Sequence, residues 1–195
     1  MGEGEQALST YTYEAYLALE AESETKYEFH DGYIIAMAGG TPAHSQISGN
    51  VIWSLNDVIR RSGKTCIVHT SDLKVRIDST RRTYYPDVSV VCDSPSYSEK
   101  DPNALTNPIL IIEVLSESTA AFDRGAKFSH YRQIASLREY ILVSQEEAVV
   151  DTYFRTESGL WDIQTIEGVS EIVELKSLDC TIAMRDIYRL VPNIP

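Results

Sequence analysis

Two acidic residues interrupt apolar stretches that have the composition of buried β-strands. Asp87 precedes Val88-Ser89-Val90-Val91, and Glu113 stands inside the run 110–115. An ionised carboxylate is costly to bury unless a hydrogen-bonded partner or a bound cation replaces its lost hydration. With Lys127 just beyond them, two carboxylates on strands of one sheet indicate a small metal-dependent active site. The structural alternative is a pair of carboxylates held by caps or ion pairs at strand ends.

Composition indicates a globular protein of one domain. The 195 residues are 43% hydrophobic and 24% charged, enough to bury a core and too apolar for a disordered chain. No run approaches the roughly 18 apolar residues of a membrane span, and the acidic N-terminus is unlike a signal peptide. Three dispersed cysteines, Cys66, Cys92 and Cys180, argue against a zinc cage and a disulfide scaffold. We therefore expect a cytoplasmic protein without a membrane partner.

The charge distribution does not decide whether the protein binds nucleic acid. A formal charge of −12 disfavours non-specific binding to phosphates. The window from Arg60 to Arg82, however, holds seven basic and two acidic residues, which leaves +5. Solvated faces of a helix and a hairpin would explain this window, and a surface that faces phosphate would explain it as well.

Periodicity and capping residues predict how these groups are positioned. Thr12 can cap a helix over 13–22, Gly63 ends a long helix that follows Pro42, and a third helix covers about 120–134. Asp31-Gly32 predicts a hairpin between strands at 27–30 and 33–37. Further strands are expected at 65–69, 73–77, 86–91, 110–115, 138–144, 148–155, 160–167 and 171–175, with a loop over 94–108 and a helical turn from Met184. This order predicts a tail at 1–12 and one α/β domain at 13–195, with a mixed central sheet flanked by helices.

The order of these motifs resembles the restriction-endonuclease-like PD-(D/E)XK phosphodiesterase superfamily, and within it the bacterial Uma-type family. The segments that carry this resemblance are 27–32, Ala43-His44, 85–91, 110–119, 123–131 and 137–140. They span nearly the whole chain, from Tyr13 to Val191. The resemblance implies a restriction-endonuclease-like core.

The resemblance also assigns roles to residues of this chain. Asp87 and Glu113 match the metal-binding carboxylates, the carbonyl of Val114 is a further ligand, and Glu28 matches an extra acidic residue near the N-terminus. Such oxygen ligands suit Mg²⁺ or Mn²⁺. His44, Asp123 and Tyr131 are candidates for contacts around the metal ligands or with substrate.

One position departs from the superfamily pattern. The lysine usually stands two residues after the glutamate, where this chain has Leu115. The Uma-type likeness implies that Lys127 reaches the site from the following helix instead. Asp123, Lys127 and Tyr131 are spaced by four residues and share one helix face. An ordinary surface pair between Asp123 and Lys127 is the alternative.

The resemblance implies a Mg²⁺- or Mn²⁺-dependent DNA endonuclease, in which a water activated by the metal attacks phosphorus. A catalytically silent binding or interaction module on the same fold is the alternative, and hydrolysis of a small phosphodiester is a third reading. Homodimers are common in this fold, and the apolar segments 148–150 and 172–173 offer candidate edges.

Overall fold

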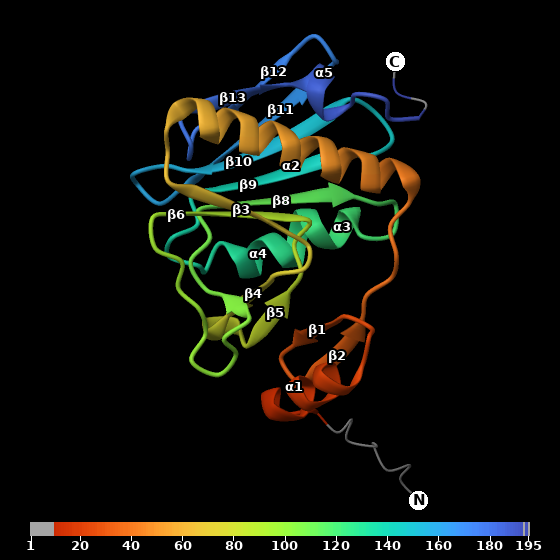
Figure 1. Ribbon diagram of the computed structural model, residues 1–195, viewed down its shortest axis with the longest axis vertical. Helices are drawn as coiled ribbons and strands as arrows, with labels where there is room; N and C mark the ends of the chain where they lie inside the picture. The colour runs from red at the N-terminus through yellow and green to blue at the C-terminus, as the bar shows by residue number, and fades with distance from the viewer. Residues whose placement is uncertain (1–9, 193, 195) are drawn as a thin grey trace, which may run out of the picture.

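The structure, a computed structural model, describes residues 10–192 and residue 194. Its large sheet has the strand order β11-β10-β9-β8-β6-β3, in which β8 and β9 run parallel and the other neighbours antiparallel (Figure 1). These strands are β3 (Cys66–Thr70), β6 (Val88–Cys92), β8 (Leu110–Leu115), β9 (Glu139–Ser144), β10 (Val149–Arg155) and β11 (Trp161–Glu167). The expected mixed α/β architecture is confirmed.

A second sheet of five strands has the order β2-β1-β5-β4-β7. Its strands are β1 (Tyr27–His30), β2 (Tyr33–Ala36), β4 (Lys74–Ile77), β5 (Arg82–Tyr84) and β7 (Ala104–Leu105). Asp31 and Gly32 join β1 to β2 with φ angles of 50° and 100°, which is the left-handed pair that a type I′ turn requires. A separate hairpin pairs β12 (Ile172–Leu175) with β13 (Cys180–Ala183).

Helices cover both faces of the large sheet (Figure 1). The long helix α2 lies across one face, and α3 and α4 lie on the other, between the two sheets. The helical segments are α1 (Tyr13–Glu22), α2 (Pro42–Ser62), the 3₁₀ turn η1 (Asp78–Thr80), α3 (Ala120–Phe122), the π-helical η2 (Asp123–Lys127), α4 (Phe128–Tyr131) and α5 (Met184–Ile187). None of the helices in the described residues is long and apolar enough to cross a membrane.

Local signals explain the bounds of the first two helices. The hydroxyl of Thr12 accepts a hydrogen bond from the Ala15 amide at 3.1 Å, and that of Thr41 accepts one from the His44 amide at 3.1 Å. These N-caps satisfy amides that have no partner within the helix. Gly63 ends α2 with φ 70°, a left-handed conformation that glycine adopts without strain.

Strand alternation divides the core between the two faces of β8. Leu110, Ile112 and Val114 pack on the side of α2, whereas Ile111 and Leu115 pack on the side of α4 and the small sheet. Glu113 has the same parity as Ile111 and Leu115, so its side chain points toward α3 and α4.

The structure differs from the expected elements in several places, which include the strand β5. The helix expected over 120–134 contains the π-helical turn η2 and ends at Tyr131, because tight turns then carry Ile134 into the core. The expected loop 94–108 includes β7 and the buried Asp101, which binds the Lys74 ammonium at 2.7 Å. The strand β13 was not expected and packs behind α2.

Two inferences from the sequence are wrong. Segment 148–150 is not a free sheet edge, because β10 pairs with β9 on one side and with β11 on the other. Cys66 and Cys92 stand opposite each other on β3 and β6 and form a disulfide. The dispersed cysteines therefore give no argument for a reducing compartment, and cytoplasmic location and dimer formation stay predictions.

Candidate active site

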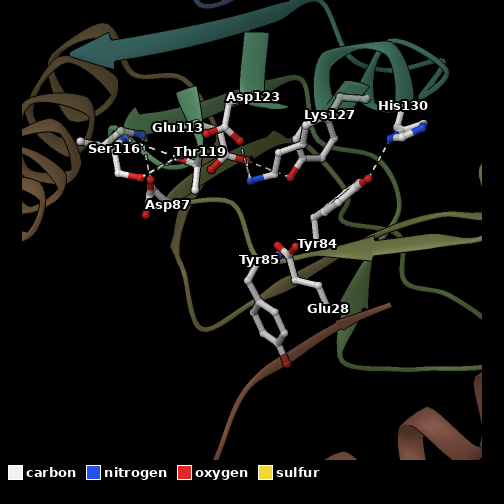
Figure 2. Close-up of polar contacts among 12 residues, drawn as sticks. Glu28, Tyr84, Tyr85, Asp87, Glu113, Ser116, Thr119, Asp123, Lys127 and His130 are labelled. Atoms are coloured by element: carbon white, nitrogen blue, oxygen red, sulfur yellow. Dashed lines mark hydrogen bonds and ion pairs between the residues drawn. The ribbon is translucent and has the colours of Figure 1, made fainter. Parts of the chain in front are cut away.

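The pairing of β6 with β8 brings Asp87 and Glu113 to the same place. Val88 pairs with Ile112 in an antiparallel register, so the next position in that register sets Asp87 against Glu113. Residues directly opposite each other in an antiparallel pair share one face of the sheet. Asp87 lies one residue before β6 rather than inside it. Figure 2 shows both carboxylates on the side of Lys127 and Asp123.

Asp87 is held by two donors. Its Oδ2 accepts a hydrogen bond from the Val114 amide at 2.7 Å and lies 3.1 Å from Nε2 of His44. His44 comes from the first turn of α2, which the Thr41 cap fixes. The hydrogen bond to Asp87 raises the pKa of His44, against burial, which lowers it. The structure thus places His44 beside a carboxylate.

Glu113 is the buried centre of the site. Its Oε1 forms an ion pair with Nζ of Lys127 at 2.7 Å and accepts a hydrogen bond from the hydroxyl of Tyr131 at 3.1 Å. Both partners come from the helical segment after β8, Lys127 from η2 and Tyr131 from α4. Leu115, in the usual lysine position, packs in the core instead. The expected approach of Lys127 from the following helix is therefore seen in the structure.

Asp123 supplies a third buried carboxylate. Its Oδ1 lies 3.3 Å from Nζ of Lys127, yet within the described residues this buried oxygen makes no hydrogen bond. The contact is therefore an ion pair without a hydrogen bond. The backbone carbonyl of Asp123 accepts from the Tyr140 hydroxyl at 3.1 Å, which fixes the start of η2. The surface pair considered for Asp123 and Lys127 is thus a buried pair that faces Glu113.

Glu28 reaches the site from the small sheet (Figure 2). Its Oε2 lies 2.9 Å from Nε2 of His30, and its Oε1 accepts from the Tyr85 amide at 3.3 Å. Tyr85 lies in the connection from β5 of the small sheet to β6 of the large sheet. The short segment from Tyr85 to Asp87 therefore positions both carboxylates: its first residue binds Glu28, and its last residue is Asp87.

Burial and crowded charge decide the protonation of the central pair. The pKa of Glu113 is raised to about 8: burial raises it most, Lys127 lowers it, and Asp87 and Asp123 raise it. Burial alone would lower the pKa of Lys127, but Glu113, Asp123 and Glu28 together raise it well above its ordinary value. Lys127 is therefore a stable ammonium and a hydrogen-bond donor rather than a base.

The donor set has the chemistry of a site for a hard divalent cation. Carboxylate oxygens and a backbone carbonyl are the ligands that Mg²⁺ and Mn²⁺ prefer, and the buried Oδ1 of Asp123 has a lone pair that no hydrogen bond uses. Among the described residues, no three His, Cys, Asp or Glu side chains already stand at spacings that would hold an ion. In this arrangement Lys127 contacts Glu113, and His44 contacts Asp87. A bound cation would have to displace Lys127 and His44 from the carboxylates that they contact.

A second group of polar side chains adjoins the carboxylates. Nζ of Lys127 lies 5.6 Å from the centre of the Tyr84 ring, and the Tyr84 hydroxyl lies 2.8 Å from Nδ1 of His130. Nε of Arg82 donates to Nε2 of His130 at 3.0 Å. This series of contacts, from Tyr84 through His130 to Arg82, was not predicted from the sequence. Alternation along β5 places Arg82 and Tyr84 on one face and is the signal that could have indicated it.

The basic window between Arg60 and Arg82 does not form one continuous patch. Arg60 and Arg61 pair with Asp57 on α2, and Lys74 is buried between Glu20 and Asp101. The reading of solvated and paired charges accounts for most of the window. Arg82 is the member next to the carboxylates.

Comparison with known proteins identifies the family. The model of the Uma2 family, described as "Putative restriction endonuclease", matches residues 13–185. The chain belongs to the Uma2 family. Two relatives from Synechocystis, the uncharacterized proteins slr1290 and sll1609, are 40% and 33% identical over 176 and 159 residues. These matches cover 90% and 82% of this chain and 90% and 89% of the relatives.

A crystal structure from Anabaena variabilis has the same fold. It is described as a "putative nuclease belonging to DUF820" and matches with a TM-score of 0.72 at 19% identity. The match covers 90% of this chain and 96% of the other. The restriction-endonuclease-like fold of this Uma2 member is therefore shown.

Proposed function

We propose that this protein is a metal-dependent DNA endonuclease, with Asp87, Glu113 and Lys127 at its centre. The observation that carries the proposal is the meeting of a buried lysine with carboxylates from two neighbouring strands. Lys127 lies 2.7 Å from Glu113, and Asp87 lies opposite Glu113 on the same face of the sheet. Membership of the Uma2 family supports a nuclease.

Asp87, Glu113 and the carbonyl of Val114 would hold Mg²⁺ or Mn²⁺, with Glu28 as a further ligand. When bound, the cation supplies Lewis acidity to water and to phosphate oxygens. The Val114 amide fixes the carboxylate of Asp87, and the Tyr131 hydroxyl fixes that of Glu113. These contacts hold the ligands in place before substrate arrives.

Lys127 would stabilise charge on the phosphate that is attacked. Its raised pKa keeps it protonated at neutral pH, so it donates hydrogen bonds and carries a positive charge. A donor that is already positioned where negative charge develops lowers the barrier without further reorganisation. Asp123, 3.3 Å from Nζ, and Glu113 aim the ammonium. In this site Lys127 acts by charge and position.

The test is cleavage of supercoiled plasmid DNA by the purified protein with Mg²⁺ or Mn²⁺. We expect nicking that falls by a factor of roughly 10²–10³ or more in Asp87→Asn and in Lys127→Met. Asp162→Asn, which changes an exposed carboxylate on β11, should cleave like the wild type. Full activity in Asp87→Asn would exclude the proposed ligand.

The alternative is a catalytically silent binding module, and one observation favours it. Lys127 and Glu113 form a buried ion pair, so Glu113 has a positively charged partner without a metal ion. Calorimetric titration with Mn²⁺ separates the two functions. Heat of binding that disappears in Glu113→Gln supports the nuclease, and absence of both binding and cleavage supports the silent module.

A further inference from the structure

A row of side chains crosses the small sheet next to the carboxylates. His30 on β1 pairs with Tyr33 on β2 and with Arg82 on β5. Residues directly opposite each other share a face, so these three side chains lie on the same side of the sheet. Glu28, two residues before His30, is on that side too. Glu28 therefore belongs to the carboxylate site and also to the same sheet face as this row.

Arg82 is the positively charged residue of this row, and its hydrogen bond to His130 fixes the orientation of the guanidinium. Nε of Arg82 donates to Nε2 of His130 at 3.0 Å, which requires that this nitrogen be unprotonated. His130 then carries its proton on Nδ1 and donates it to the Tyr84 hydroxyl at 2.8 Å. Burial, followed by the charges of Arg82 and His30, lowers the pKa of His130 and favours this neutral form.

The terminal nitrogens of Arg82 are available to a ligand. Within the part of the chain that the structure describes, they make neither a hydrogen bond nor an ion pair with a carboxylate. Neighbouring Arg81 differs, since it pairs with Asp31 at 3.3 Å. A guanidinium fixed at Nε presents its other two nitrogens as a fork, the geometry that binds phosphate oxygens.

Two exposed aromatic residues neighbour His30, which lies directly opposite Arg82 on β1. The ring of Phe122, on α3, stacks on His30 with centroids 5.9 Å apart and planes at 12°, and 37% of Phe122 is exposed. Tyr33, at the other end of the row, is 50% exposed. A cation near exposed aromatic rings is an arrangement with which proteins bind nucleic-acid strands whose bases are unpaired.

The centre of the site makes such a contact necessary for an anionic substrate. Carboxylates from both sheets converge there, and Lys127 is already engaged by Glu113 and Asp123. A cation at the centre would serve the phosphate that is cleaved. A positive group beside the centre would bind the next phosphate along the strand, and Arg82 shares a face of the small sheet with Glu28.

We propose that Arg82 and Phe122, which both neighbour His30, form a subsite for an unpaired nucleotide next to the cleaved phosphodiester. Arg82 binds the phosphate of that nucleotide, and Phe122 stacks against its base. His130 is a positioning residue for Arg82. This subsite rests on the proposed nuclease function and adds to it a preference for single-stranded or locally unpaired nucleic acid.

The test measures binding and cleavage of a fluorescent single-stranded oligonucleotide and of its duplex. In an Asp87→Asn background, fluorescence anisotropy at several salt concentrations gives the dissociation constant and its salt slope. Arg82→Gln should weaken single-strand binding roughly tenfold and reduce the salt slope by about 0.7, the contribution of one phosphate contact. In the active enzyme the same change should raise KM more than it lowers kcat.

Matched variants separate charge from folding. Arg81→Gln changes the neighbouring arginine, which is paired with Asp31, and should leave affinity and slope unchanged. Arg82→Lys should keep the slope, because it keeps the charge, and it tests the subsite if Arg82→Gln does not fold. Phe122→Ala should reduce the ratio of single-strand to duplex affinity several-fold, because only an unpaired base can stack on the ring.

The outcomes distinguish this inference from the proposed function. Cleavage by the wild type, with unchanged affinity and salt slope in Arg82→Gln, would overturn the subsite and leave the nuclease intact. An unchanged strand preference in Phe122→Ala would overturn the base contact. If the wild type neither binds nor cleaves any oligonucleotide, both proposals fall together.

Discussion

Replacement of Lys127 by methionine isolates the energetic role of the buried cation. The ammonium lies 2.7 Å from Glu113 and 3.3 Å from Asp123, and all three side chains are buried. Methionine keeps most of the side-chain volume and removes the charge. Breaking a buried ion pair from one side costs about 3–5 kcal/mol, because it leaves the other charge without a partner. We expect the free energy of unfolding to fall by up to that amount above pH 8, where Glu113 ionises in the wild type, and by less at neutral pH, where Glu113 holds its proton.

The pH dependence of this loss follows from Glu113. In the wild type its pKa is raised to about 8, against about 4.3 in an unfolded chain, so the folded state binds the extra proton between these values. Stability therefore falls as pH rises through that window, in wild type and variant alike. In Lys127→Met the pKa of Glu113 rises further, because the neighbour that lowers it most is gone.

The free energies of unfolding of the wild type and of Lys127→Met should diverge above pH 8. There the wild-type Glu113 ionises beside the ammonium, while the variant keeps its proton and goes on losing about 1.4 kcal/mol per pH unit. The difference between the proteins should be about 2 kcal/mol larger at pH 9.5 than at pH 6.5. Urea unfolding in EDTA at these two pH values measures it, with the exposed Lys64→Met as the matched control. A difference that stays constant with pH, or stays below about 1 kcal/mol, would refute this reasoning.

Three further changes test other parts of the fold. Gly63→Ala should destabilise by about 1 kcal/mol in thermal unfolding, because the residue that ends α2 has φ 70°. Tyr131→Phe should cost about 1.5–3 kcal/mol above pH 8, measured by urea unfolding, since it removes a donor to the ionised Glu113; an equal cost at pH 6 would contradict this. Reduction of the Cys66–Cys92 disulfide should lower stability by about 3–4 kcal/mol, because it opens a loop of 26 residues, and the melting temperature with and without reductant measures it.

Elements that are defined by local chemistry could be predicted from the sequence. The caps Thr12 and Thr41 and the terminal Gly63 fix α1 and α2 within one residue, and Asp31-Gly32 fixes the first hairpin. The apolar run around Glu113 gave β8 directly. Each of these depends on interactions within a few residues, which a single sequence displays.

Features that depend on register between distant strands could not be predicted in the same way. The Cys66–Cys92 bond needs β3 beside β6 in one register, and composition carries no record of that pairing. The row from Tyr33 to Arg82 likewise needs three strands in register. Lys127 was placed by family resemblance, and its contact with Glu113 depends on a π-helical turn that periodicity does not indicate.

The short connection from β5 to β6 has a consequence for how this protein can be divided. Tyr85 holds Glu28 at one end, and Asp87 begins the large sheet at the other, so a single stretch of backbone sets the spacing of groups from both halves of the molecule. Neither half is a self-sufficient module. A truncation that deletes the N-terminal hairpin removes Glu28 and leaves the Tyr85 amide without its acceptor. A chimera that joins two relatives at this connection should therefore take both sides of it from one parent.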